Sequence, residues 1–328
     1  MTATAVVETP ARARDRAELL RALGVQAEPP GPAQDRLADL LGLPRPTGAD
    51  WTEAFMVQLV PYASVYLGAE GMLGGEAADR VAGFWRALRL PVPAEPDHVA
   101  TLLGLYASLI EAEPDAPAGP QAALLRQART ALLHEHLTSW LPAYAHAMAD
   151  SGPPPYAAWA HLLRETLLAE AAHLGVPQRL PAHLRAVPPV AADGGRADLL
   201  DGLLAPARSG IVLSRAHLAA AARHTGLGLR LGGRRAVLRA LVEQDPAAAL
   251  QALADQARGW LDRHRADEPV VGPAAGHWAA RASATADLLA TAGHTANPPT
   301  AASAGPPDER PPVAGPGAEP GAEPEEPS

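Results

Sequence analysis

The stretch Glu95–Glu113, EPDHVATLLGLYASLIEAE, joins an amphipathic helix to an unusual beginning. Pro96 favours an extended Glu95, and Asp97 is expected to cap the helix so that His98 takes the first helical position. After this start, apolar residues recur at helical spacing, which predicts a helix with one face in a core. These residues are Val99, Leu102, Leu103, Tyr106, Leu109 and Ile110.

Composition predicts an all-α fold. The chain has 328 residues, enough to bury a sizeable core, and only 4% of them are aromatic. Alanine and leucine are frequent, and no run of β-branched residues alternates with period two. Cysteine is absent, which excludes disulfides, thiol nucleophiles and cysteine-based metal centres. Neither a signal peptide nor an apolar run of ~20 residues is present, so we expect a cytoplasmic protein without a membrane span.

Charge is distributed unevenly along the chain, whose net charge is −9. Acids predominate between Glu70 and Asp115, whereas the stretch from Arg208 to Arg239 contains no acid at all. Each cluster has an ordinary interpretation as the solvated face of a helix. The acidic region is also suited to a partner that carries arginines.

The expected organisation is a disordered N-terminus over residues 1–13 and a helical domain over residues 14–266. The segment 151–156, SGPPPY, is expected to form a hinge between two helical subdomains. Residues 267–328 are rich in proline, alanine and glycine, and we expect them to be mostly disordered. Within this stretch, we consider a short helix over residues 277–290.

Two Glu-x-x-His pairs raise the alternative of a di-iron carboxylate bundle. They are Glu95 with His98 and Glu170 with His173. That chemistry needs each pair on one helical turn, and Pro96 places Glu95 outside the helix. We therefore expect neither a metal ion nor another cofactor.

A second alternative is DNA binding by a helix-turn-helix element. The segment 213–242 contains a capped helix, a glycine-rich turn and a second helix that begins with Arg234 and Arg235. The acidic net charge argues against a nucleic-acid partner. No phosphate-binding glycine loop and no Gly-x-Ser-x-Gly motif occurs either, which disfavours an enzyme.

Four segments resemble the TorD family of molybdoenzyme chaperones, which includes DmsD and NarJ. EPDHVATLLGLYASL (95–109) resembles the family's Glu-Pro-Asp-His helix start. PYASVYLGAEGMLGG (61–75), VAGFWRALRL (81–90) and LLHEHLTSWLPAYAHAM (132–148) resemble its flanking segments in the same order. The similarity is specific from about Trp51 to Met148, is looser beyond that range, and is absent from the C-terminal tail.

The resemblance implies a TorD-like helical bundle, monomeric or dimeric, that acts as a cytoplasmic chaperone rather than an enzyme. Its partner would be the apo catalytic subunit of a molybdopterin oxidoreductase, bound through a twin-arginine leader or an equivalent N-terminal segment. The chaperone would keep this subunit competent for cofactor insertion, assembly and export. Carboxylates would bind the arginines of the leader, and aromatic rings would contact its apolar part. The residues expected to do so are Glu95, Pro96, Asp97, His98, Tyr62, Tyr66 and Trp85. For Asp97 a purely capping role, and for Trp85 a place in the core, stay open.

Overall fold

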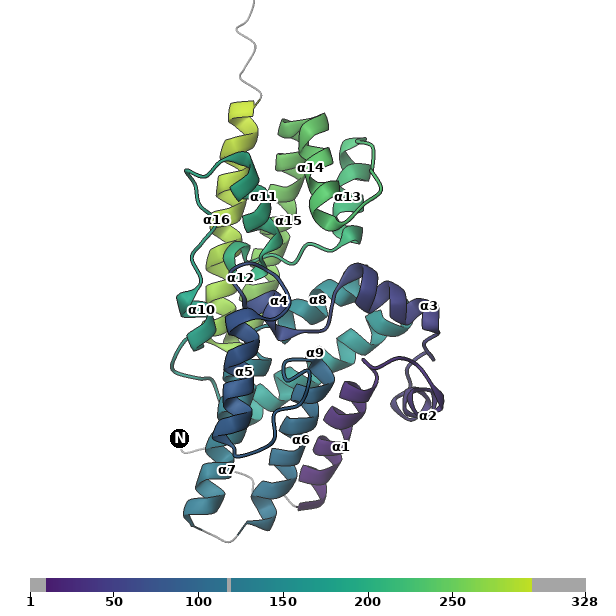
Figure 1. Ribbon diagram of the computed structural model, residues 1–328, viewed down its shortest axis with the longest axis vertical. Coiled ribbons are helices and arrows are strands. Elements are labelled where there is room, and N and C mark those ends of the chain that lie inside the picture. The colour runs from purple at the N-terminus through teal and green to yellow at the C-terminus, as the bar shows by residue number, and fades with distance from the viewer. Residues whose placement is uncertain (1–9, 117–118, 297–328) are drawn as a thin grey trace, which may run out of the picture.

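The computed structural model describes residues 10–116 and 119–296, and these residues form helices and connecting loops without a β-strand. The helices lie in two tiers, an N-terminal tier over residues 10–174 and a C-terminal tier over residues 182–296 (Figure 1). The all-α prediction is therefore confirmed. Within the described residues, no helix combines the length and the apolarity that crossing a membrane requires.

The N-terminal tier consists of α1 (Pro10–Val25), α2 (Pro32–Leu41), α3 (Gly48–Trp51), the π-helical η1 (Thr52–Gln58), α4 (Ala63–Leu67), α5 (Gly75–Ala87), α6 (Val99–Asp115), α7 (Pro120–Ala131), the π-helical η2 (Leu132–Leu137), α8 (Leu141–Ser151) and α9 (Pro154–Leu174). The C-terminal tier consists of α10 (Ala182–Ala186), α11 (Arg196–Leu204), α12 (Pro206–Ser209), α13 (Arg215–Thr225), α14 (Arg234–Gln244), α15 (Pro246–Val271) and α16 (Pro273–Ala296).

The core of the N-terminal tier is built by α6 against α1 and by α8 against α9. The apolar face predicted for residues 99–110 is buried as expected. Aromatic rings fill the space around it, and Trp159 of α9 donates its Nε1 hydrogen to the carbonyl of Leu23 in α1 (2.9 Å). The buried rings are those of Phe55, Tyr66, Tyr106, Trp140, Tyr144, Tyr156 and Trp159.

The expected hinge at residues 151–156 lies inside the N-terminal tier. Gly152 and Pro153 join α8 to α9, and the two helices pack against each other. The connection between the tiers is instead the irregular segment 175–195, which contains the short helix α10. Proline clusters occur in both segments, so composition alone does not distinguish a tight helical turn from a connection between tiers.

The folded region extends beyond Asp267, where the disordered tail was expected to begin. Helix α15 continues to Val271, the chain reverses at Gly272 (φ +73°), and α16 runs back along α15 to Ala296 (Figure 1). The rest of the expected tail, residues 297–328, lies outside the described residues, as do residues 1–9.

Small side chains explain why composition was misleading for α16. Its alanines bring the helix close to neighbouring backbone: a Cβ atom on Gly210 (φ +72°) would lie 2.3 Å from the nitrogen of Ala282. Two hydrogen bonds fix α16 in place, from Trp278 Nε1 to the carbonyl of Ser139 (2.8 Å) and from Thr285 Oγ1 to the carbonyl of Ser209 (2.8 Å). An Ala-rich segment can therefore offset its ordering entropy when close packing is available.

Candidate functional site

Residues 95–98 form a corner that pairs with the residues just before α4. Ala63 N donates a hydrogen bond to the carbonyl of Asp97 (3.0 Å), and Val99 N donates to the carbonyl of Pro61 (2.9 Å). These two bonds form an isolated antiparallel bridge, so the corner is bonded to residues more than thirty positions earlier. We call residues 95–98 the acidic corner.

Asp97 is buried in this corner, with 5% of its surface exposed. Its Oδ2 accepts a hydrogen bond from Ser64 N (3.0 Å), one of the free amides in the first turn of α4. The expectation that Asp97 caps its own helix is therefore wrong, because the backbone pairing carries its side chain to a different helix. A carboxylate in this position stabilises the fold and is not presented to a partner.

His98 is the N-cap of α6 instead of its first helical residue. Its Nδ1 accepts a hydrogen bond from Ala100 N (3.2 Å), which requires an unprotonated Nδ1. Burial lowers the pKa of His98 below its ordinary value, although the negative charges of Glu28 and Glu95 act in the opposite direction. Helix capping and burial thus favour the neutral ring.

Glu95 and Glu28 are the exposed carboxylates at the corner. Glu95 Oε1 accepts a hydrogen bond from the Tyr62 hydroxyl (2.8 Å), and Glu28 Oε1 lies 3.7 Å from His98 Nδ1. Tyr62 is partly buried with its ring against His98, and burial together with Glu95 raises its pKa to about 12. Pro96 is half-buried at the turn. Glu95 and Glu28 are therefore the acids that an incoming cation can reach.

The two other predicted aromatic residues, Tyr66 and Trp85, are buried and half-buried, respectively. Tyr66 is 1% exposed, donates its hydroxyl to the carbonyl of Val60 (2.9 Å) and stacks on Trp140, so it belongs to the core and not to a groove. Trp85 on α5 is half-buried and packs against the core. Its Nε1 is buried and has no hydrogen-bond partner among the described residues.

A glycine-rich loop over residues 68–75 connects α4 to α5 and is the part of the site that the sequence analysis did not identify. Met72 and Leu73 are 65% and 59% exposed at its tip. Gly74 N donates to Ser64 Oγ (3.1 Å), and Ser64 is also the residue that Asp97 holds. The loop is thereby connected to the acidic corner through one side chain. Its signal in the sequence was a methionine and a leucine between glycines.

Gly71 allows this loop to lie against the C-terminal tier. A Cβ atom there would be 2.7 Å from the carbonyl oxygen of Leu204, and its φ of +63° also favours glycine. Between the loop and the start of α14 is a cavity of about 500 Å³. Its walls are formed by the loop, by the end of α11 and by three arginines: Ala69, Glu70, Gly71, Met72, Asp201, Leu204, Arg208, Gly233, Arg234 and Arg235.

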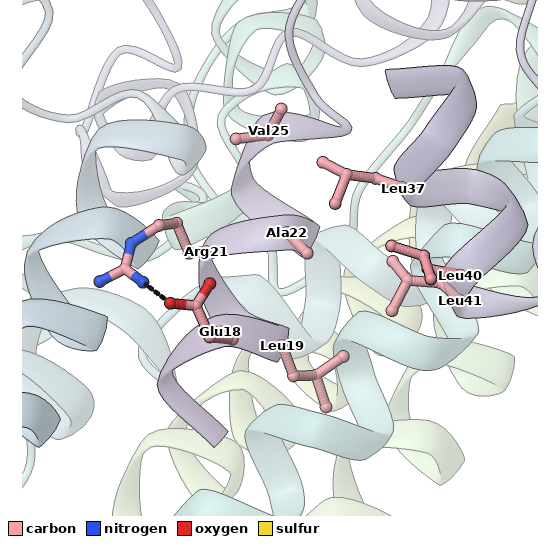
Figure 2. Close-up of a pocket in the computed structure, with 8 residues that line it drawn as sticks. All are labelled: Glu18, Leu19, Arg21, Ala22, Val25, Leu37, Leu40 and Leu41. Atoms are coloured by element: carbon pink, nitrogen blue, oxygen red, sulfur yellow. Dashed lines mark hydrogen bonds and ion pairs between the residues drawn. The ribbon is translucent and has the colours of Figure 1, made fainter. Parts of the chain in front are cut away.

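A second hollow, of about 410 Å³, lies between α1 and α2 and is mainly apolar (Figure 2). Leu37, Leu40 and Leu41 of α2 lie opposite Leu19, Ala22 and Val25 of α1, with the Glu18–Arg21 ion pair beside them. The exposed fraction of Leu40 is 81%. The last α1 residue in this hollow, Val25, precedes Glu28 by three positions, and Glu28 lies beside His98 of the acidic corner.

In the part of the chain that the structure describes, the two Glu-x-x-His pairs do not form a di-iron site. No group of three or more histidine, aspartate or glutamate side chains there could hold a metal ion. Glu170 is instead buried, accepts a hydrogen bond from the Tyr106 hydroxyl (2.9 Å), and pairs with Arg16 (2.6 Å). Its buried carboxylate thus has both a hydroxyl donor and the partly buried guanidinium group of Arg16 as partners.

The arginines of the predicted recognition helix are directed into the protein's own contacts. Arg234 donates to the carbonyl of Leu213 (3.0 Å), and Arg235 pairs with Asp201 (2.8 Å). Both residues also line the cavity beside the loop 68–75. This geometry does not support a helix that presents its first turn to a DNA groove.

Comparisons with known proteins agree with this arrangement. Residues 32–146 match a family model described as nitrate reductase delta subunit. Two curated relatives, both named chaperone protein TorD and from the YJ016 and CMCP6 strains of Vibrio vulnificus, are 31% identical over 130 residues. Each alignment covers 36% of this chain and 59% of the relative. No solved structure matches.

The matched residues contain the acidic corner, the loop 68–75 and the helices α2 to α7 with η2. This is the region where the resemblance in the sequence was specific. The comparisons agree with the resemblance: residues 32–146 are similar to the nitrate reductase delta subunit family, and the chain spans 59% of the length of the TorD relatives that it matches.

Proposed function

We propose that the protein is a cytoplasmic, non-enzymatic chaperone for the catalytic subunit of a molybdopterin oxidoreductase. It binds the N-terminal segment of that subunit, a twin-arginine leader or its equivalent, and keeps the subunit competent for cofactor insertion, assembly and export. The match of residues 32–146 to the nitrate reductase delta subunit model and the similarity to the TorD relatives support the chaperone role.

One observation carries the leader-binding part of the proposal: an exposed carboxylate, that of Glu95, and exposed apolar side chains lie at the two ends of the same short helix, α4. Glu95 contacts Tyr62 just before α4, and Met72 and Leu73 follow α4 directly. A leader offers arginines beside an apolar stretch. Its cations would meet Glu95 and Glu28, and its apolar side chains would cover the loop tip.

Asp97 has a different part in this proposal from the one that its motif suggested. Its carboxylate is occupied by Ser64, and Ser64 also holds the loop. Asp97 therefore acts on recognition by positioning the loop 68–75. We assign direct contact with the leader's arginines to Glu95 and Glu28.

Titration calorimetry with a synthetic twin-arginine leader peptide tests the assignment. Replacing Glu95→Gln together with Glu28→Gln should weaken binding by ~1 kcal/mol or more, about fivefold, because two charge-assisted contacts are lost. Glu165→Gln, at an exposed acid of α9, is the matched control and should leave the affinity unchanged.

A second peptide, in which lysines replace both arginines, shows whether binding depends on the planar guanidinium groups. The double variant should reduce the preference for arginine over lysine, because only arginine can bind a carboxylate in bidentate fashion. Equal affinity of the variant and the unmodified protein for the arginine peptide would reject the acidic corner as the leader site.

A further inference from the structure

The connection between α13 and α14, residues 226–233, has no part in the proposed function and exposes both apolar and cationic side chains. Its sequence is GLGLRLGG, and it lies at the outer edge of the C-terminal tier (Figure 1). Leu229 is 50% exposed, and Leu231 is 95% exposed, so its side chain protrudes from the surface. Arg230 between them is exposed as well. We call residues 229–231 the leucine–arginine tip.

The chain on either side of this tip is fixed to α14. Gln244 Oε1 accepts a hydrogen bond from Gly228 N (2.9 Å), and Gln244 Nε2 donates to the carbonyl of Gly228 (2.8 Å). Gly232 (φ +143°) lies against the same helix, because a Cβ atom there would be 3.2 Å from the Cβ of Ala236. The tip is therefore displayed on an anchored base, and the glycines beside it have no side chains that could cover the leucines.

The arginines around the tip keep part of their charge. Residues 223–239 contain five arginines and no acid. Two arginines of α14 are paired with acids from outside this range: Arg235 with Asp201 (2.8 Å) and Arg239 with Glu243 (3.8 Å).

Two exposed arginines remain without compensation. Arg223, in the last turn of α13, and Arg230, in the tip itself, have no ion-pair partner among the residues that the structure describes. They are seven positions apart, and the two exposed leucines lie within one position of Arg230. Unpaired positive charge and protruding apolar side chains thus occur on one short stretch of the surface.

This combination matches the surface of an anionic membrane. Guanidinium groups bind the phosphate oxygens of lipid headgroups, and apolar side chains enter the boundary between headgroups and acyl chains. A bilayer deforms around a protruding side chain, whereas a protein partner needs a hollow of matching shape to cover it. Leu231, with nearly all of its surface exposed, fits the deformable partner better.

We propose that the leucine–arginine tip attaches the protein reversibly to an anionic lipid surface. Leu229 and Leu231 enter the headgroup boundary, and Arg223 and Arg230 bind lipid phosphates. Two apolar side chains alone give weak attachment, so binding depends on the negative charge of the lipid. No residue assigned to the leader belongs to the tip, and the attachment does not depend on the proposed chaperone function.

Sedimentation of the full chain with lipid vesicles tests this proposal. Vesicles made of equal parts of phosphatidylglycerol and phosphatidylcholine should bind the protein. Vesicles of phosphatidylcholine alone should bind it at least roughly tenfold more weakly, because they have no net charge that attracts arginine. High salt should weaken binding to the anionic vesicles, since it screens the attraction between exposed charges.

Substitutions identify the surface that meets the lipid. Leu229→Ser together with Leu231→Ser should weaken binding to anionic vesicles by roughly tenfold, because the inserted apolar area is lost. Arg223→Gln together with Arg230→Gln should weaken it by roughly twentyfold, about fivefold for each arginine.

Matched controls lie on helices of the N-terminal tier. Leu124→Ser, at a residue of α7 that is 65% exposed, and Arg36→Gln, at an exposed residue of α2, should leave binding unchanged. Melting curves of all variants verify that the fold is retained.

The absence of cysteine allows a label to be placed at the tip. An environment-sensitive fluorophore on Leu231→Cys should shift its emission to shorter wavelength when anionic vesicles are added, because the label enters a less polar medium. The same fluorophore on Leu124→Cys should not shift. This measurement reports insertion directly and does not depend on the affinity.

Three results would overturn the proposal. They are a full chain that does not bind anionic vesicles, equal binding by the leucine double variant and the unmodified protein, and an unshifted emission at position 231. If the chain binds polyglutamate instead of vesicles, and the arginine double variant does not, the partner of the tip is an acidic protein segment. None of these measurements contains a client, so failure of the proposed chaperone function would not be mistaken for failure of the lipid contact.

Discussion

The acidic corner and the loop 68–75 reverse the usual relation between polarity and burial. The corner contains two acids and a histidine, yet Asp97 and His98 are buried and bonded to backbone amides. The loop carries Met72 and Leu73, yet these apolar side chains face solvent. Buried polar groups that are fully paired fix local structure, whereas exposed apolar side chains are available to a partner.

This difference separates the structural part of the site from the part that meets a partner. The corner holds α4, and Ser64 at the start of α4 holds the loop. A substitution of the buried Asp97 or His98 should therefore act first on stability, and one in the loop should act on binding alone. The predictions below, from the largest expected effect to the smallest, test this division.

Asp97→Ala should cause the largest loss of stability in the corner. The substitution leaves the buried amide of Ser64 without an acceptor, at a cost of about 1 to 3 kcal/mol in the free energy of unfolding. Asp97→Asn retains an oxygen acceptor and should cost well under half of that. Urea denaturation of the three proteins measures both values. Equal stability of the alanine and asparagine variants would contradict the capping role across the corner.

Acid should destabilise the corner through His98. Because the pKa of His98 is lowered in the folded state, the unfolded chain binds the proton more readily. The stabilisation is therefore present above the ordinary histidine pKa of about 6.5 and is lost as the pH falls below it, by at most ~1.4 kcal/mol per pH unit. His98→Asn keeps a capping oxygen and does not titrate, so its unfolding free energy should fall less steeply between pH 7 and 5. If the unfolding free energies of the unmodified protein and of His98→Asn fall equally between pH 7 and 5, the titration of His98 does not contribute to this loss of stability.

Replacing Met72 and Leu73 by serine should weaken binding without weakening the fold. Burial of these side chains under a leader peptide is worth about 1 to 2 kcal/mol, so the affinity should fall by about five- to thirtyfold. The unfolding free energy should stay within ~0.5 kcal/mol, since both residues face solvent. Calorimetric titration and denaturation of one preparation give both numbers. A large loss of stability would show that the loop tip belongs to the core.

Glu95→Gln is expected to have the smallest effect on the fold. Glutamine can still accept the hydrogen bond from Tyr62, and an exposed polar contact contributes little, so the change should lie within ~0.5 kcal/mol. The same variant lowers the pKa of the Tyr62 hydroxyl by removing a neighbouring negative charge. Ultraviolet titration of tyrosine detects this change, and an unaltered Tyr62 titration would indicate that the hydrogen bond does not form.

Local patterns in the sequence were sufficient for much of the fold. The apolar spacing from Val99 to Ile110 identified a helix whose predicted core residues are all buried. Asp245 followed by Pro246 is the pattern of an N-cap before a first-turn proline, and Asp245 does accept a hydrogen bond from Ala248 N (3.0 Å) at the start of α15. Both signals depend on residues within one or a few turns of each other.

The errors concern contacts between distant residues. Asp97 has the spacing of a cap for α6, but pairing with residues 61–63 directs it to α4. Tyr66 is close to acids in the sequence and is nevertheless stacked on Trp140 in the core. For the segment of α16 (Pro273–Ala296) only a short helix over residues 277–290 was considered, because alanine contributes little burial by itself, while the close packing of α16 depends on Gly210 and α15. One-dimensional patterns carry no information on such pairings.

The hydrogen bond from Trp278 to Ser139 has a consequence for the order in which the protein is completed during synthesis. Ser139 belongs to the N-terminal tier, but its partner is translated 139 residues later. At ~5 to 20 residues per second, the nascent N-terminal tier waits about 7 to 30 s for Trp278. During this interval the place that α16 will cover is open to other apolar segments. The last described helix therefore completes both tiers, and a ribosome-bound chain that lacks it should be the form of this protein most prone to aggregate.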